Sequence, residues 1–376
     1  MKKCLGDIAT YVNGYAFKPS DRGTKGLPII RIQDLTGNSY DLGYYDGNYP
    51  GKIEINDGDI LISWSASLGI YIWNRGKALL NQHIFKVVFD KCDVNKQYFV
   101  FAVQYKLQEM MDKTHGATMK HIVKKDFDNT LIPFPSFDTQ RKIANILSKV
   151  NVIISARKRQ IEMIDELIKS RFIELFGDPV GNPKGWTMVP LGTRCEIITG
   201  NTPSRAEAKN YGEFIEWIKS DNINTPYTFL TEAQEYLSEI GFQKCRFVEA
   251  GSLLMTCIAG SVNCIGNVAV ADRRVAFNQQ INAIVPNEDE VLYLYWLMLL
   301  SKPAIHRAIN MALKGILSKR QLSEMMFPFP PVALQKQFVT FVEQTDKSKL
   351  TIQKSLDELE TLNKALMQKY FGGNGV

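Results

Sequence analysis

The chain of 376 residues repeats itself, and this duplication limits its fold more than any other feature. Leu5-Gly6 recurs as Leu191-Gly192, an offset of 186 residues. The offset then grows, settles at 195 from Tyr98 and Tyr293 onward, and stays there to the end of each copy. Insertions are tolerated in surface loops and are excluded where a length has to be kept. We therefore predict that each copy has a first part with variable loops and a second part of fixed length.

The fixed part of each copy is predicted to be one long helix. After a Pro-Phe-Pro sequence, Asp138 or Thr139 is expected to cap the first helix. Its apolar positions step alternately by four and three over about five heptads, which is typical of a coiled coil. These seam positions are Ile143, Leu147, Val150, Ile154, Arg157, Ile161, Ile164, Ile168, Arg171 and Leu175, and, 195 residues later, Phe338, Val342, Thr345, Lys349, Ile352, Leu356, Leu359, Asn363, Leu366 and Tyr370.

The first part of each copy is predicted to be a compact α+β module. In the first copy, β-rich runs separated by turn residues lie at 27–32, 59–63, 69–73 and 84–89. A helix is expected over residues 97–111, with its counterpart near 291–300. The predicted fold class is α+β, with two similar globular domains joined and separated by two long helices that form an antiparallel coiled coil with pseudo-twofold symmetry. The predicted boundaries are 1–137 and 178–332 for the domains, and 138–177 and 333–372 for the helices.

Composition narrows the classes of protein. The chain has 45 Lys and Arg against 39 Asp and Glu, a net charge of +6, which is a mild basic excess compatible with a polyanionic partner. The longest apolar run, residues 291–300, is about half of the ~20 residues that a membrane span requires. The N-terminus shows no secretory signal, so we expect a cytoplasmic protein. The six cysteines are scattered without a C-x-x-C pair, which indicates free thiols and no metal site.

The ordered repetition of short motifs resembles the specificity subunit of type I restriction-modification systems over essentially the whole chain. The motifs are Leu5-Gly-Asp with Gly14, Leu191-Gly-Thr with Gly200, Gly58-Asp-Ile-Leu-Ile-Ser63, Gly251-Ser-Leu-Leu-Met-Thr256, Pro133-Phe-Pro135 with Gln140, Pro328-Phe-Pro330 with Gln335, Phe176-Gly177 and Phe371-Gly372. The family usually has Glu-Gln after Pro-x-Pro, whereas this chain has Thr139-Gln140 and Leu334-Gln335. This departure affects the subunit contacts that the resemblance implies at the Pro-x-Pro motif, and it leaves the resemblance to the family unchanged.

The resemblance implies a non-catalytic subunit. Its modules would be target recognition domains, its helices conserved spacers, and its partners double-stranded DNA, two modification (methyltransferase) subunits and restriction subunits. No cofactor is expected in this chain, since S-adenosylmethionine, ATP and Mg²⁺ would be held by partner subunits. The predicted function is to recognise an asymmetric bipartite DNA site, one half per domain, across an unread spacer. DNA half-sites read from one face lie about 34 Å apart or a multiple of that, a distance that a rod of two helices would set.

Two other functions remain open at this point. A stand-alone nuclease would use Asp178 with Glu207-Ala-Lys209, since carboxylates with a lysine can hold Mg²⁺ around a phosphodiester. A coiled-coil scaffold would make no specific DNA contact. The sequence has neither an Asn-Pro-Pro-aromatic motif for amino methylation nor a Walker-type phosphate loop.

Candidate DNA contacts lie at matching places in the two modules, because cations bind phosphates, and polar side chains read base edges. In the first module they are Lys18, Ser20, Arg22, Arg31, Gln33, Ser63, Ser65, Ser67, His83, Lys113, His115, Lys120, His121 and Lys124. In the second they are Thr202, Ser204, Arg205, Lys219, Asn222, Ser261, Gln280, Lys314, Ser318, Lys319 and Arg320. Each of these also has a plainer interpretation, as a solvated surface residue or as part of a hydrogen-bonded turn.

Overall fold

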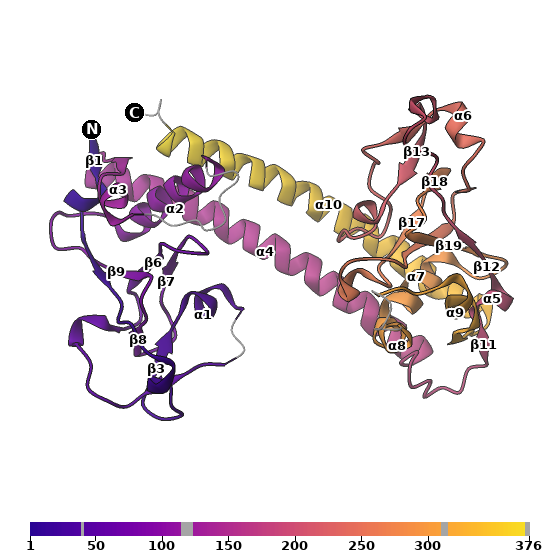
Figure 1. Cartoon of the computed structure of the whole chain (residues 1–376), viewed down its shortest axis with the longest axis horizontal. Coiled ribbons are helices and arrows are strands. Elements are labelled where there is room, and N and C mark those ends of the chain that lie inside the picture. The colour runs from indigo at the N-terminus through magenta and orange to yellow at the C-terminus, as the bar shows by residue number, and fades with distance from the viewer. Residues whose placement is uncertain (39–40, 114–122, 310–314, 373–376) are drawn as a thin grey trace. The chain divides into compact units, whose positions relative to one another are not determined.

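The computed structural model describes residues 1–38, 41–113, 123–309 and 315–372 (Figure 1). The chain divides into two compact units. Unit 1 comprises Met1–Lys158 and Lys354–Val376, and unit 2 comprises Arg159–Gln353. Among the described residues, none of the helices combines the length and the apolar character needed to cross a membrane.

Unit 1 contains two four-stranded sheets and a strand pair. The antiparallel sheet has the order β2 (Thr10–Asn13), β9 (Ile84–Val88), β6 (Ile60–Ser63) and β7 (Gly69–Ile72). The mixed sheet has the order β4 (Tyr44–Tyr45), β3 (Leu27–Ile30), β8 (Ala78–Leu80) and β5 (Glu54–Ile55), with β3 and β8 parallel. Strand β1 (Lys2–Cys4) pairs with β10 (Leu131–Pro133), and the shorter helices are α1 (Ile32–Thr36), α2 (Lys96–Lys113) and α3 (Lys124–Asp128).

Unit 2 repeats this topology strand for strand. Its antiparallel sheet has the order β12 (Cys195–Thr199), β19 (Ile281–Pro286), β16 (Ser252–Thr256) and β17 (Val268–Ala271). Its mixed sheet has the order β14 (Tyr236–Leu237), β13 (Tyr211–Ile218), β18 (Val275–Phe277) and β15 (Phe247–Val248), with β13 and β18 parallel. Strand β11 (Met188–Pro190) pairs with β20 (Met326–Pro328), and the shorter helices are α5 (Leu191–Arg194), α6 (Glu239–Phe242), α7 (Val291–Leu300), α8 (Lys302–Ala308) and α9 (Lys319–Glu324). The predicted α+β duplication is therefore confirmed.

Alternate residues of the central strands face two different cores. In unit 2, Leu253 and Met255 of β16 pack in a cluster with α7 and the long helices. Leu254, between them, packs in a second cluster with residues of the mixed sheet. Successive side chains of a strand point to opposite faces. Because β16 is covered on both faces, its residues 253–255 are all apolar and do not alternate with polar ones. Strand β6 repeats this pattern in unit 1.

Two helices of 40 residues, α4 (Phe137–Phe176) and α10 (Val332–Phe371), complete the chain, and each unit contains part of both. Within each unit they run antiparallel (Figure 1). In unit 1 the Nζ of Lys158 lies 2.8 Å from Oε1 of Glu360. In unit 2 the Nζ of Lys349 lies 2.5 Å from Oδ1 of Asp165. Every one of the predicted seam positions is buried or half-buried, so the heptad pattern located the packed face of both helices.

A buried glutamine and a tyrosine bind the first module to the start of α4. Gln140 Nε2 donates to the carbonyl of Pro135 at 3.0 Å, and its Oε1 accepts from the backbone N–H of Asn95, just before α2, at 3.0 Å. The hydroxyl of Tyr98 donates to the carbonyl of Pro133 at 2.8 Å. These bonds fix where the helix starts relative to the module.

The second module has the same bonds at the start of α10. Gln335 Nε2 donates to the carbonyl of Pro330 at 3.0 Å, and its Oε1 accepts from the N–H of Glu290 at 3.0 Å. Tyr293 donates to the carbonyl of Pro328 at 2.8 Å. One bond is additional, from Gln335 Nε2 to Oδ1 of the buried Asp289 at 2.7 Å. The glutamine after the Pro-x-Pro motif thus binds the module to the long helix within this chain in both copies.

The far end of each long helix packs on the other copy's module. Phe371 at the end of α10 lies 5.3 Å from the ring of Tyr98 in unit 1. Phe176 at the end of α4 lies 4.9 Å from the ring of Tyr293 in unit 2. Each module is therefore held by the start of its own helix and the end of the other one. An insertion between the start and the end of either long helix would break this packing. This is the physical reason why the offset between the two copies stays at 195 residues.

Two local predictions are wrong. Helix α4 begins at Phe137, and Ser136 Oγ accepts from the N–H of Thr139 at 3.4 Å, so Ser136 precedes the helix in place of Asp138 or Thr139. The run over residues 27–32 leaves the strand at Ile30, because the carboxylate of Asp34 accepts from the N–H of Arg31 at 2.8 Å and starts α1. A capping interaction outweighs β propensity at that position.

Candidate nucleic-acid interface

In unit 1, two arginines converge on Asp41, close to strand β4. Arg31 follows β3, and its Nε and Nη2 lie 3.0 and 3.2 Å from the two carboxylate oxygens of Asp34. The same Nη2 donates to the backbone carbonyl of Asp41. Arg22, from the loop between β2 and β3, places its Nη2 3.3 Å from Asp41 Oδ2. The Asp41 carboxylate is exposed and Arg22 is partly exposed, whereas Arg31 is largely buried and held by Asp34.

In unit 2, Arg205 and Lys219 converge on Glu235, and here both cations reach the carboxylate. Arg205 Nη2 lies 2.9 Å from Glu235 Oε2, and Lys219 Nζ lies 2.6 Å from Oε1. The hydrogen bond from Lys219, together with that from Arg205, holds the pKa of the Glu235 carboxyl below its usual value. Both cations lie against the buried Trp217, at 5.2 Å for Arg205 and 5.4 Å for Lys219 from its ring centroid. Arg205 also lies 4.9 Å from the ring of Tyr211.

The turns before β9 and β19 differ in their third residue. His83 has a left-handed backbone with φ of 72°, is half-buried, and its ring lies 4.9 Å from that of Trp64. Gln280, at the matching place, is also half-buried and is bonded to Asn278 through Oε1 at 3.3 Å and through its N–H at 3.1 Å. One turn therefore presents an imidazole where the other presents an amide.

The loops after β6 and β16 contribute less to the surface than their sequences suggest. Ser63 is fully buried, and its hydroxyl donates to the carbonyl of Ser67 at 2.5 Å. This side chain faces the interior and is not part of a surface site. Ser65 is half-buried, while Ser67 and Ser261 are exposed.

Other candidates divide between the interior and the surface. Asn222 is 5% exposed, and its Oδ1 accepts from the N–H of Lys219 at 3.0 Å, so it is a structural cap. The hydroxyl of Thr202 donates to the side chain of Gln279. The exposed side chains are those of Lys18, Ser20, Gln33, Thr202 and Ser204.

Helices α3 and α9 place basic residues at matching positions. Lys124 is exposed at the start of α3, and Lys319 and Arg320 are exposed at the start of α9. Ser318 caps α9, with its Oγ accepting from the N–H of Gln321 at 3.2 Å. Lys113 ends α2, and its side chain, like His115, Lys120, His121 and Lys314, lies outside the described residues.

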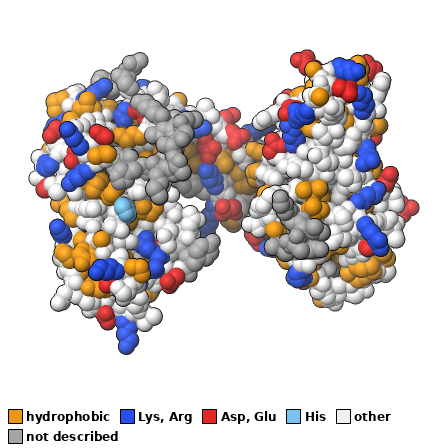
Figure 2. Space-filling model, viewed as in Figure 1, with side chains coloured by type: hydrophobic (Ala, Val, Ile, Leu, Met, Phe, Trp, Pro, Cys, Tyr) orange, Lys and Arg blue, Asp and Glu red, His pale blue; other side chains and the backbone are white. Residues whose placement is uncertain are grey.

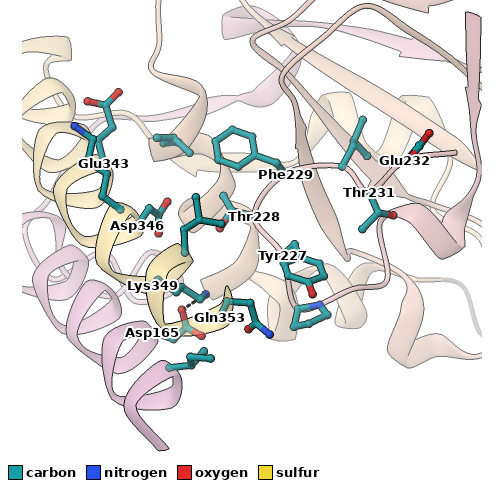
Figure 3. Close-up of a pocket in the computed structure, with 16 residues that line it drawn as sticks. Asp165, Tyr227, Thr228, Phe229, Thr231, Glu232, Glu343, Asp346, Lys349 and Gln353 are labelled. Atoms are coloured by element: carbon teal, nitrogen blue, oxygen red, sulfur yellow. Dashed lines mark hydrogen bonds and ion pairs between the residues drawn. The ribbon is translucent and has the colours of Figure 1, made fainter. Parts of the chain in front are cut away.

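A pocket of about 900 Å³ in unit 2 is a poor match to a polyanion (Figure 3). It lies between the long helices and residues 226–232, and Figure 3 shows the ion pair of Lys349 with Asp165 on its helical side. Burial raises the pKa of Asp346. The charged residues of the lining are Asp165, Glu232, Glu343, Asp346, Lys347 and Lys349. Carboxylates outnumber lysines there, so a phosphate backbone would be repelled.

Charges elsewhere are dispersed. Figure 2 shows Lys and Arg side chains interspersed with Asp and Glu on the visible face of each unit. Local clusters of cations are therefore better candidates than a continuous basic patch. The nuclease alternative, which would use Glu207 with Asp178 and Lys209, gains no support. The Glu207 carboxylate is instead paired with Lys244 at 2.8 Å. Within the described ranges, no group of three or more His, Cys, Asp and Glu is placed to hold a metal ion.

The family model described as "Type I restriction modification DNA specificity domain" matches residues 1–164 and 183–361. The chain belongs to this family. Among the curated specificity subunits, it is 24% identical over 412 residues to that of the type I restriction enzyme EcoBI from Escherichia coli, covering 98% of this chain and 85% of that protein. It is 22% identical to that of MjaVIII from Methanocaldococcus jannaschii, covering 86% and 80%.

Solved structures show the same fold. The S subunit of the type I restriction-modification system from M. genitalium aligns with a TM-score of 0.60 at 16% identity, over 99% of this chain and 96% of that one. A chain from a study of type I system assembly aligns with a TM-score of 0.52 at 18% identity, over 100% and 98%.

In this specificity-domain chain, sequence reasoning found the cations of the two clusters and missed their partners. Asp34 lies three residues after Arg31, the spacing of a capping box, and that signal was readable. Asp41 and Glu235 lie on other segments, and no spacing connects them to the cations that they bind. Trp217 is buried on a β-rich run, where an aromatic residue predicts core packing alone.

Proposed function

We propose that this specificity subunit reads an asymmetric bipartite DNA site, one half with each module. The observation that carries the proposal is that two modules of one topology present different side chains at the same places. Arg31 corresponds to Lys219, and His83 corresponds to Gln280. Cations contact phosphates and polar side chains read base edges, so the two modules would favour different bases.

The two half-sites would be separated by a spacer of fixed length. This part of the proposal rests on the constant offset of 195 residues and on the 40-residue length of each helix, about 60 Å at 1.5 Å per residue. A site read from one face of DNA repeats about every 34 Å. The chain would thus set the gap by helix length and the bases by its loops.

Catalysis would reside in partner chains, namely two modification subunits and, in the full enzyme, restriction subunits. S-adenosylmethionine, ATP and Mg²⁺ would bind to those partners. Support for docking comes from large apolar side chains on α4 that are exposed to solvent in this chain. In unit 1 these are Ile146, Val152 and Ile153, and in unit 2 Met163, Leu167 and Ile173. Exposed apolar residues along a helix are typical of helix-to-helix interfaces.

Methylome sequencing of the source cell with and without this gene tests the proposal. Loss of methylation at one bipartite motif, with two different halves and a constant gap, is the expected result. The purified complex with its modification subunits should then bind a duplex carrying that motif at least 10³-fold more tightly than a scrambled duplex, at equal salt. Equal binding of the two duplexes would favour a scaffold. Cutting of plasmid DNA by this chain alone with Mg²⁺ would favour a nuclease.

A further inference from the structure

The two modules share an arrangement of charges as well as a topology. In each, one cation comes from the loop between the first two strands of the module's sheets, Arg22 after β2 and Arg205 after β12. A second cation follows the parallel strand of the mixed sheet, Arg31 after β3 and Lys219 after β13. Both reach one acidic residue close to the next strand of that sheet. The acidic residues are Asp41 before β4 and Glu235 before β14.

Retention of three charged groups at matching places in two copies that differ in sequence indicates a shared role. The side chains themselves are not the same, because Arg31 corresponds to Lys219 and Asp41 corresponds to Glu235. Unit 1 also adds Asp34 beside Arg31. The two positive groups with one acidic residue between them are what the modules have in common.

In unit 2 the ion pair of Arg205 with Glu235 is too exposed to serve mainly as a stabilising bond. In unit 2 the side chains of Arg205 and Glu235 are 56% and 35% exposed. Ion pairs in contact with water contribute little to folding, because water and salt screen them. A second anion that reaches the cluster can therefore replace the carboxylate at low cost. Trp217 and Tyr211 keep the Arg205 guanidinium in place through their ring faces, whichever anion it binds.

We propose that each carboxylate occupies the position of a DNA backbone phosphate, and that the phosphate displaces it when the module binds its half-site. The inference rests on the proposed function and adds where the phosphodiester binds. In the free chain, Glu235 holds Arg205 and Lys219 in the geometry for two-point contact with an anion. On DNA, one phosphate oxygen would accept from each cation, and Glu235 would turn to solvent. In unit 1 the phosphate would take the place of the Asp41 carboxylate at Arg22, next to Arg31, which bonds to the Asp41 backbone carbonyl.

Charge counting gives a test that a structural ion pair would not pass. The cluster of Arg205, Lys219 and Glu235 has a net charge of +1, and Glu235→Gln raises it to +2. The slope of log affinity against log salt changes by about 0.9 for each phosphate neutralised. Glu235→Gln should therefore steepen the slope by about one and raise affinity about eightfold near 0.1 M salt. Arg205→Ala should flatten the slope by about one.

The double variant Arg205→Ala/Glu235→Gln is the matched control, since its net charge returns to +1 and its slope should return to that of the unaltered protein. Affinity is measured by fluorescence anisotropy of a labelled duplex carrying the motif, from 50 to 200 mM salt, on the complex with its modification subunits. The pair Asp41→Asn and Arg22→Ala/Asp41→Asn repeats the test in unit 1. Thermal unfolding of each variant establishes that the fold is kept.

A flatter or unchanged salt slope for Glu235→Gln in a folded complex would overturn the proposal that the carboxylate occupies the position of a phosphate. In that event the proposed function would still stand if the complex kept its preference for the motif over the scrambled duplex. Loss of that preference in the unaltered complex would instead overturn the proposed function. The two failures are therefore distinguishable.

Discussion

At the junctions between modules and helices, the two units share the same bonds, and unit 2 adds one from Gln335 to Asp289. Tyr98 and Tyr293 each donate to a proline carbonyl at 2.8 Å, and Gln140 and Gln335 each donate to another at 3.0 Å. At the ends of the strands, the same two units present different residues. Unit 1 has a pair of arginines there, and unit 2 has an arginine with a lysine beside Trp217. The comparison separates the junction residues, which hold the helix length constant, from the strand-end residues, which are free to vary.

This difference explains where the sequence accepts insertions. A junction residue has partners on two elements at once, so a shift of either element breaks several buried bonds. A strand-end residue such as Arg205 pairs through a partly exposed side chain with a residue of another loop, here Glu235. Loops of this kind can change length and composition while the sheets and helices stay as they are.

The largest effect is expected at the aromatic ends of the long helices. Phe371→Ala and Phe176→Ala each remove a ring that is 1% or 2% exposed, and each should cost about 3–5 kcal/mol of unfolding free energy. Urea unfolding checks this, with Phe137→Ala, 49% exposed, as a control that should cost little. Near-equal losses would support the equivalence of the junctions, whereas a large loss in only one unit would break it.

Gln140 and Gln335 allow a second comparison of the two junctions, with a smaller expected change in the free energy of unfolding. Gln140→Leu leaves a carbonyl and an N–H without partners, at a cost of about 2 kcal/mol. Gln335→Leu also removes the bond to the buried Asp289 carboxylate, so its cost should be larger, about 3 kcal/mol. The measurement is urea unfolding of both variants side by side. The reverse order would show that the additional bond to Asp289 does not stabilise unit 2.

The smallest expected effect concerns the surface. Lys319→Ala/Arg320→Ala removes two exposed cations from α9 and should weaken DNA binding by the complex about tenfold. It should also flatten the salt slope by about one to two. Lys319→Arg/Arg320→Lys keeps both charges and should bind almost as the unaltered complex does. An unchanged slope for the alanine variant would remove α9 from the interface.

The long-range architecture was predictable because the sequence repeats with a regular helical period and a constant offset between the copies. The four-three spacing located the packed faces of α4 and α10, and the offset of 195 residues paired Gln140 with Gln335 before their bonds were known. Helix α2 was predicted over residues 97–111 and spans Lys96–Lys113. Buried periodic segments carry such signals because their packing repeats along the chain.

The chemistry of the surface was predictable only in part. Matching places in the two modules selected Arg205 and Lys219, yet Glu235 reaches them from another segment, and that contact depends on the sheet. Ser63 resembled a surface serine in sequence and is fully buried with its hydroxyl bonded inside the loop. Whether a short polar side chain faces water is decided by the turn, and turns of this kind carry no periodic signal.

One measurement tests most directly the claim that helix length sets the gap between the half-sites. A further helical turn inserted after Ile161, with a matching turn inserted after Ile352 in α10, adds about 5.4 Å to the helix pair. At about 3.4 Å per base pair, methylome sequencing should show a spacer longer by one to two base pairs and both half-sites unchanged. The same insertion in the exposed loop at Gly47 should leave the gap as it was. An unaltered gap with changed half-sites in the helix variant would contradict the account.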